Sequence, residues 1–260
     1  MDAASITTPV TPWRSPPATM VLSRDDVHVW RATLDQPLSE ILNFRRSLAA
    51  DEQTRAARFY FERDRKHFII ARGVLRAILG FYLNRAPECL SFCYNSYGKP
   101  ALAEEPNLDA IRFNVSHSHG EALYAVTRGR AVGIDVERIR PDLPVAQIAG
   151  RFFSQREIMM LRALPGEMQR QAFFRYWTHK EAYIKARGEG LSLPLDQFDV
   201  SLDPGEPGIV VGTSQDPSEG SRWSLKEITS CPDYAAAVAV EGHDWRLTCW
   251  QWPDPSQLSV

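Results

Sequence analysis

The chain has 260 residues, 44% of them hydrophobic and 24% charged, which is the composition of a water-soluble globular protein with a substantial core. A net charge of −2 excludes the binding of nucleic acid through overall charge, and no apolar run is long enough to cross a bilayer. The four cysteines show no C-x-x-C spacing, so we expect reduced thiols in a cytoplasmic protein.

The N-terminal segment differs from the rest of the chain. Its first 20 residues contain four prolines and one basic residue, and they lack the apolar stretch of a signal peptide. We therefore expect a disordered leader over residues 1–24.

A strand and a long helix are predicted next. Residues 27–34, VHVWRATL, alternate apolar and polar side chains, which is typical of a strand. Residues 63–83 show helical spacing of apolar positions. The predicted buried stripe comprises Phe68, Ala71, Leu75, Ile78 and Tyr82. Off this stripe we expect three arginines that face a ligand or water: Arg65, Arg72 and Arg76.

Three short strands follow, IRFNVSHS, EALYAVT and AVGIDVE, over residues 111–118, 121–127 and 131–137. The intervening HSHG and TRGR suit tight turns, which predicts an antiparallel meander.

The C-terminal part begins with helices. Ser154 and Glu157 have the spacing of a capping box, and a helix predicted over residues 167–187 ends at Gly188 and Gly190. Five strands are predicted after it, in FDVSL, GIVVG, WSLKEI, YAAAVAV and WRLTCWQW. The element order predicts an α+β protein of two similar halves, residues 25–132 and 133–255.

The segment GIDVE places two acids in an otherwise apolar strand. Asp135 and Glu137 project from the same face, about 6.5–7 Å apart. Two carboxylates on one face suit a hard divalent cation such as Mg²⁺. An acidic strand end that pairs with Arg138 and Arg140 is the simpler interpretation, and the pentapeptide alone favours it.

A second candidate lies in WTHKEAYIKARGEGL. Glu181 and Lys185 are four residues apart on the predicted helix and therefore share a face. An exposed Glu–Lys pair is the ordinary explanation, but Trp177, Ala182 and Ile184 indicate a largely buried helix. An acid and a cation at this position would serve a metal ion and a phosphate together.

Phosphate-binding candidates precede both sites. The strand end FNVSHS offers donors from Asn114, Ser116 and His117, and YGKP places Lys99 on a tight turn. Residues 45–76 hold nine Arg or Lys against four Asp or Glu. Ordinary turn polarity and a solvated helix face are the alternative readings. P-loop, dinucleotide-binding and serine-hydrolase motifs are absent from the sequence.

In this order the motifs resemble the 4′-phosphopantetheinyl transferases of the surfactin-synthetase-activating, broad-specificity type. The likeness covers residues 25–245. The matching segments are FNVSHS at 113–118, GIDVE at 133–137, RFFSQRE at 151–157 and WTHKEAYIKARGEGLSLPL at 177–195, with RAARFY at 55–60 and YGKPAL at 97–102.

The resemblance implies an α+β pseudo-dimer with its active site in the cleft between the two halves. The implied enzyme transfers 4′-phosphopantetheine from coenzyme A to a serine of an apo acyl or peptidyl carrier protein and releases 3′,5′-ADP. It also implies a cytoplasmic monomer that needs neither nucleic acid nor a membrane. A catalytically silent relative would bind these partners without transfer, but the metal acids and Lys185 are all present.

The resemblance also implies roles for individual residues. Asp135, Glu137 and Glu181 match the acids that hold Mg²⁺, and Lys185 matches the lysine on the coenzyme A pyrophosphate. Residues that match coenzyme A contacts are Arg55, Lys99, Ser116 and His117.

Two assignments stay open. Glu157 matches a glutamate proposed to deprotonate the carrier serine, and Glu181 competes for that role. Glu52 stands where relatives often carry lysine, and Arg72 and Lys66 are spaced to replace the missing contact with the adenosine phosphate.

Overall fold

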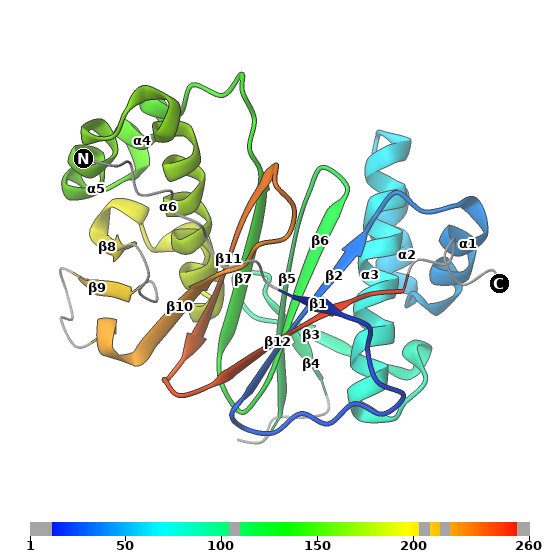
Figure 1. Ribbon diagram of the computed structural model, residues 1–260. Coiled ribbons are helices and arrows are strands. Elements are labelled where there is room, and N and C mark those ends of the chain that lie inside the picture. Colours follow the sequence, from blue (N-terminus) through cyan, green and yellow to red (C-terminus); the bar gives the residue numbers. More distant parts are fainter. Residues whose placement is uncertain (1–11, 104–109, 203–208, 214–218, 254–260) are drawn as a thin grey trace. The chain divides into compact units, whose positions relative to one another are not determined.

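The computed structural model describes residues 12–103, 110–202, 209–213 and 219–253. The chain forms two compact units. The N-terminal unit contains Trp13–Gly129 and the final strand, which begins at Arg246, and the C-terminal unit contains Arg130–Trp245. Both units combine helices with strands, so the predicted α+β class is confirmed (Figure 1).

A five-stranded sheet forms the frame of the N-terminal unit. Its strands, in spatial order, are β1 (Trp13–Arg14), β12 (Arg246–Gln251), β2 (Asp26–Thr33), β6 (Glu121–Arg128) and β5 (Ile111–Ser118). The β5–β6 hairpin turns at His119 and Gly120, both with positive φ, as the HSHG motif predicts.

Helices cover this sheet. They are α1 (Leu38–Ser47), α2 (Ala50–Ala57) and α3 (Glu62–Leu83). The α3 helix packs its predicted apolar stripe against β2, β5 and β6 (Figure 1). A separate hairpin of β3 (Phe92–Tyr94) and β4 (Pro100–Leu102) follows α3 in the chain.

Arg72 and Arg76 do not face water, contrary to one of the two predicted environments, and a ligand contact of Arg72 stays a prediction. Arg72 is 9% and Arg76 1% exposed, because both guanidinium groups point to the buried carboxylate of Glu52 on α2. Spacing along α3 gave no sign of a partner on another helix. Arg65 is exposed, as predicted.

The two ends of the chain do not follow the predicted division into a leader and two halves. The β12 strand pairs in parallel with β2 of the N-terminal unit, although its sequence position predicts the C-terminal half. Within the predicted leader, Trp13 and Arg14 pair with β12, and Met20 and Leu22 belong to the core. Residues 1–11 lie outside the described part of the chain.

The C-terminal unit contains a three-stranded antiparallel sheet in the order β10 (Trp223–Glu227), β11 (Tyr234–Glu241) and β7 (Val132–Arg138). The predicted meander is therefore wrong at its third strand, because β7 leaves β6 and pairs with β11. The helices are α4 (Val145–Phe152), α5 (Gln155–Ala163) and α6 (Gly166–Arg187). A two-stranded ribbon completes the unit, formed by β8 (Phe198–Ser201) and β9 (Ile209–Thr213).

The α6 helix lies directly on β7 and β11 (Figure 1). A Cβ atom at Gly133 would lie 2.1 Å from the Ala182 carbonyl oxygen and 2.3 Å from the Ala186 nitrogen. On the same face of the sheet, β11 contributes Ala237 and Ala239, which pair with Asp135 and Gly133. Small side chains on both elements thus permit backbone contact between helix and sheet.

Within the described ranges, no helix is long and apolar enough to span a membrane. All four cysteines lie in these ranges, and none of them forms a disulfide.

We expect the Gly133→Ala substitution to lower the free energy of unfolding by about 1–3 kcal/mol, because the added methyl group meets helix backbone. Chemical denaturation measures the change. Gly150→Ala is the matched control, since Gly150 lies in α4 with open space around its Cβ position. It should stabilise the protein by about 0.5–1 kcal/mol. Equal effects of the two substitutions would contradict the close-contact explanation.

Candidate functional site

The acidic strand and the charged helix meet in the C-terminal unit. Gly133, Asp135 and Glu137 share the β7 face on which α6 lies. The Lys185 Nζ atom is 2.6 Å from Asp135 Oδ1. Asp135 is 2% exposed, whereas the Lys185 side chain is 29% exposed. The contact joins two segments that are 50 residues apart in the sequence.

Glu181 belongs to the same cluster. Burial and the neighbouring Asp135 raise the pKa of Glu181 to about 7, with a smaller contribution from Glu137 and an opposing one from Lys185. The three predicted metal acids are therefore close enough to repel one another. A positive ion near Glu181 would reduce this repulsion.

These acids fit a hard cation in their chemistry. They offer carboxylate oxygens, which Mg²⁺ prefers, and their mutual repulsion favours a positive ion. In the parts of the chain that the structure describes, no three His, Cys, Asp or Glu side chains are arranged so that they could hold a metal ion. The Lys185 ammonium group contacts one of the two Asp135 carboxylate oxygens, Oδ1.

Glu157 lies at the start of α5, and the predicted capping box is confirmed. Ser154 Oγ accepts a hydrogen bond from the Glu157 backbone N–H at 3.2 Å, and Glu157 Oε2 accepts one from the Ser154 N–H at 3.1 Å. Glu157 Oε1 accepts a further bond from the Val200 N–H at 2.9 Å. At 1% exposure, this carboxylate connects α5 to β8.

Lys180 is the ionic partner of Glu157, and sequence reasoning did not identify this pair. Its Nζ atom lies 2.8 Å from Glu157 Oε1 and donates to the Leu195 and Phe198 carbonyls. Burial raises the pKa of Glu157 and lowers the pKa of Lys180, while each charge counteracts the shift of the other. These contacts favour a positioning role for Glu157, and its assignment as the base stays a prediction.

Lys99 lies on the turn between β3 and β4 in the N-terminal unit. Asn95 Oδ1 accepts hydrogen bonds from the backbone N–H groups of Tyr97 and Lys99, at 3.0 and 2.9 Å. Gly98 adopts a φ of +83°, which a glycine tolerates without strain. The turn therefore has a defined conformation.

The electrostatics of Lys99 suit an anion. Burial and the positive charge of Arg112 lower the pKa of Lys99 to about 8. The sequence analysis did not identify Arg112, although Arg112 lies on the same face of β5 as Asn114 and Ser116. A bound phosphate would relieve the repulsion between the two cations.

Ser116 and His117, two neighbouring candidates on β5, point to opposite faces of the sheet. Asn114 and Ser116 are buried, whereas His117 is exposed. Strand alternation therefore prevents the Ser116 and His117 side chains from lying on the same face.

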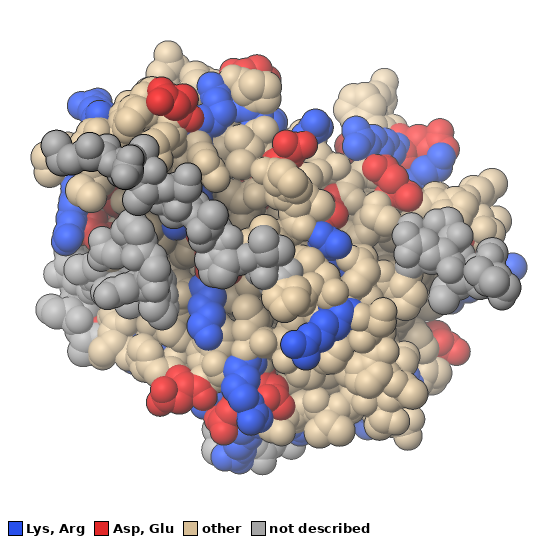
Figure 2. Space-filling view, in the orientation of Figure 1, with Lys and Arg blue, Asp and Glu red and all other residues tan. Residues whose placement is uncertain are grey.

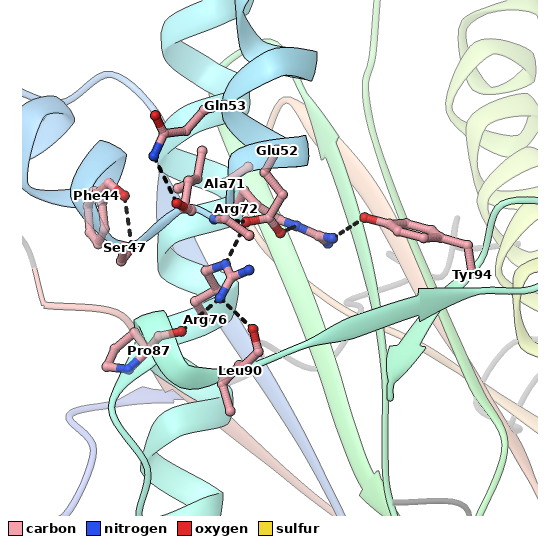
Figure 3. Close-up of polar contacts among 12 residues, drawn as sticks. Phe44, Ser47, Glu52, Gln53, Ala71, Arg72, Arg76, Pro87, Leu90 and Tyr94 are labelled. Carbon is pink, nitrogen blue, oxygen red and sulfur yellow. Dashed lines mark hydrogen bonds and ion pairs between the residues drawn. The ribbon is translucent and has the colours of Figure 1, made fainter. Parts of the chain in front are cut away.

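Arg55 and Arg72 differ in their surroundings. Arg55 is exposed on α2, with its guanidinium group 5.3 Å from the Phe68 ring centre. Arg72 donates through Nε to Glu52 and through Nη2 to the Tyr94 hydroxyl (Figure 3). These bonds orient Arg72 within the protein, and its predicted phosphate contact stays a prediction.

The basic surplus of residues 45–76 is smaller at the surface than in the sequence. Arg72 and Arg76 are buried against Glu52, and Lys66 pairs with Glu62 at 2.7 Å. Figure 2 shows basic and acidic side chains mixed over the face in view.

Two family models match the chain. Residues 30–128 match the 4′-phosphopantetheinyl transferase N-terminal family, and residues 131–239 match the 4′-phosphopantetheinyl transferase superfamily. The two matches meet where the two structural units divide, at Gly129 and Arg130.

Full-length relatives agree with these matches. The chain is 41% identical over 240 residues to the 4′-phosphopantetheinyl transferase HetI of Nostoc sp., covering 92% of this chain and 98% of that protein. It is 31% identical to the 4′-phosphopantetheinyl transferase Sfp of Bacillus subtilis, covering 82% and 91%. The L-aminoadipate-semialdehyde dehydrogenase-phosphopantetheinyl transferase of Mus musculus is 31% identical, covering 82% and 74%.

The fold, the site and the family matches define a class of enzyme that transfers phosphopantetheine. The chain has two α+β units, and an acidic strand lies beside a helix that carries Glu181 and Lys185. The chain belongs to the 4′-phosphopantetheinyl transferase superfamily.

The contacts of Glu157 lead to a prediction. Glu157→Gln keeps the side-chain shape but leaves the buried Lys180 ammonium group without its counter-charge, so we expect a stability loss of about 3–5 kcal/mol. Thermal denaturation and steady-state kinetics measure stability and turnover together. A large fall in turnover at unchanged stability would instead identify Glu157 as the base.

Proposed function

We propose that this enzyme transfers the 4′-phosphopantetheine group from coenzyme A to a serine hydroxyl of an apo acyl or peptidyl carrier protein, with Mg²⁺ as cofactor. The observation that carries the proposal is the cluster on β7 and α6, where Lys185 contacts Asp135 and Glu181 has a raised pKa. Carboxylates and a lysine side by side suit a reaction at a pyrophosphate.

The proposed reaction is a phosphoryl-type substitution. The serine oxygen forms a bond to the phosphorus that carries the pantetheine, and the bond between this phosphorus and the bridging pyrophosphate oxygen breaks. The electron pair of that bond leaves with 3′,5′-ADP, and the serine proton passes to a carboxylate. The protein contributes by orienting the groups and by neutralising charge on the leaving phosphate.

Asp135, Glu137 and Glu181 would hold the Mg²⁺ ion, which neutralises pyrophosphate charge when bound. Lys185 would exchange its contact with Asp135 for a phosphate oxygen. At 29% exposure its side chain is the more accessible member of that pair, and its stem permits the movement.

For the proton acceptor we favour Glu181 over Glu157. Without a bound cation, the pKa of about 7 lets the Glu181 carboxylate accept a proton at neutral pH. Both oxygens of Glu157 already accept hydrogen bonds from backbone groups, and Lys180 contacts one of them.

Coenzyme A would contact Lys99 through a phosphate, with Arg55, Asn114, Ser116 and His117 as further contacts. Lys99 and Arg112 supply the positive potential for this part of the proposal. The enzyme would act as a cytoplasmic monomer, without nucleic acid or membrane partners.

The principal test incubates the enzyme with an apo carrier protein, coenzyme A and Mg²⁺, and measures the intact mass of the carrier. We expect the carrier to gain one phosphopantetheine, and EDTA should prevent the gain. Asp135→Asn and Glu181→Gln should each slow transfer by about a hundredfold or more, because each removes a cation ligand.

Glu227→Gln is the control for these variants, since Glu227 pairs with Arg175 in the same unit without contact to the acidic cluster. Near-normal transfer by both acid variants would overturn the proposed metal site. If no fatty-acid, polyketide or peptidyl carrier is modified, the proposal that carrier proteins are the acceptors is contradicted.

The pKa of Glu181 predicts how the Mg²⁺ requirement depends on pH. Below about pH 7 the protonated carboxyl group competes with the cation, so the half-saturating Mg²⁺ concentration should rise as the pH falls from 8 to 6. The Glu181→Gln variant should lose this dependence. A requirement that stays constant over this range in the unmodified enzyme would exclude Glu181 as a ligand that titrates there.

The lowered pKa of Lys99 predicts a second effect of pH, on the use of coenzyme A. Its ammonium group loses its proton above about pH 8, so kcat/KM for coenzyme A should fall with rising pH beyond that value. Lys99→Arg keeps the positive charge and should remove the decline. If Lys99→Ala leaves the affinity for coenzyme A unchanged, Lys99 does not belong to the site.

A further inference from the structure

The Glu52 carboxylate is the centre of a buried charged cluster in the N-terminal unit (Figure 3). It accepts hydrogen bonds from Arg72 Nε, from Arg76 Nε at 2.7 Å and from the Ala49 N–H at 2.9 Å. Glu52 is 2% exposed, so one buried carboxylate orients two arginines and the start of α2. A buried ion cluster adds little stability over a well-packed apolar one, so its effect is better sought in the geometry that it imposes.

Both arginines reach from α3 to the hairpin that follows it. Arg76 Nη1 donates to the Pro87 and Leu90 carbonyls, at 2.8 and 2.9 Å, in the segment that leads into β3. Arg72 Nη2 donates to the hydroxyl group of Tyr94, the last residue of β3. The hairpin is thus held at its entry and at its turn.

Phe92 adds an aromatic contact to these bonds. The Arg72 guanidinium carbon lies 4.3 Å from the Phe92 ring centre, and that of Arg76 lies 5.1 Å away. Phe92 and Tyr94 are two residues apart on β3 and therefore face α3 together. Cation–π contact and hydrogen bonding act on the same short strand.

The hairpin needs such support because it is small. Among the residues that the structure describes, the β3 and β4 strands pair only with each other, through three residues each. An isolated two-stranded hairpin is marginally stable at best. The turn carries Lys99 five residues after Tyr94, and the Asn95 side chain fixes the backbone between them. Movement of Tyr94 would therefore displace Lys99.

We propose that Glu52, Arg72 and Tyr94 are positioning residues that hold the Lys99 turn in place for coenzyme A. The inference rests on the proposed function, since it assumes that Lys99 contacts a phosphate of coenzyme A. It also gives the buried Glu52 carboxylate a role, because only an acid can pair with both arginines. Arg72 acts on the hairpin through Tyr94 and Phe92.

Tyr94→Phe tests the inference, because it removes a single hydroxyl group from a side chain that is 42% exposed. We expect KM for coenzyme A to rise about threefold to tenfold, the effect of one hydrogen bond of ordinary strength lost at a partly exposed side chain. Turnover and the KM for the carrier protein should not change. Arg72→Lys keeps the charge but loses the planar fork, and should raise the KM for coenzyme A similarly.

Tyr82→Phe is the matched control. It makes the same chemical change in the same unit, on α3, where the Tyr82 hydroxyl contacts His28 Nδ1 and accepts from Trp30 Nε1 at 2.8 and 2.9 Å. We expect a lower melting temperature and an unchanged KM for coenzyme A. If Tyr82→Phe raises this KM as much as Tyr94→Phe does, the effect is general destabilisation and the inference is overturned.

A double-substitution cycle separates this inference from the proposed function. Tyr94→Phe should have no further effect on the KM for coenzyme A in a Lys99→Ala background, because the two residues act in series. Additive effects would overturn the positioning role of Tyr94 while leaving Lys99 in the site. A Lys99→Ala enzyme with normal KM would overturn the assignment of Lys99, and the inference with it.

Discussion

Backbone contact between α6 and β7 at Gly133 is the constraint on which the acidic cluster depends. The helix lies so close to the strand that its backbone occupies the space that a side chain at residue 133 would need. This distance brings Lys185 within 2.6 Å of Asp135, and Glu181 near enough for Asp135 to raise its pKa. A wider separation would place the same charges in water, where their interaction is weak. The small side chains of the β11 face serve the same purpose.

Buried carboxylates fix the elements around the candidate sites in both units. Glu157 connects the start of α5 and β8 to Lys180, which directly precedes Glu181 on α6. Glu52 connects α2 to Arg72 and Arg76, which hold the hairpin of Lys99. In each case the carboxylate is also bonded to a backbone N–H at the start of a helix. A buried ionic contact thus lies close to each half-buried candidate residue, Glu181 in one unit and Lys99 in the other.

Desolvation shifts the pKa values of two half-buried candidate residues. It moves the pKa of Glu181 up to about 7 and that of Lys99 down to about 8, so both groups titrate near neutral pH. Neighbouring like charges contribute to both shifts, from Asp135 to Glu181 and from Arg112 to Lys99. A cation at the first site and an anion at the second would each relieve this repulsion.

The sequence by itself determined the element types, the capping box of α5, the stop of α6 at Gly188 and the family, because these depend on local periodicity and on motifs. It also singled out Asp135, Glu181 and Lys185 as candidates, and the structure brings these three together. Only the tertiary structure decided that β7 pairs with β11 and that β12 joins β2. The partners of Arg72, Arg76 and Glu157 were likewise decided by folding. The ion pairs of these residues and the Glu157–Val200 hydrogen bond join segments that are 20 to 43 residues apart, and local spacing holds no information on them.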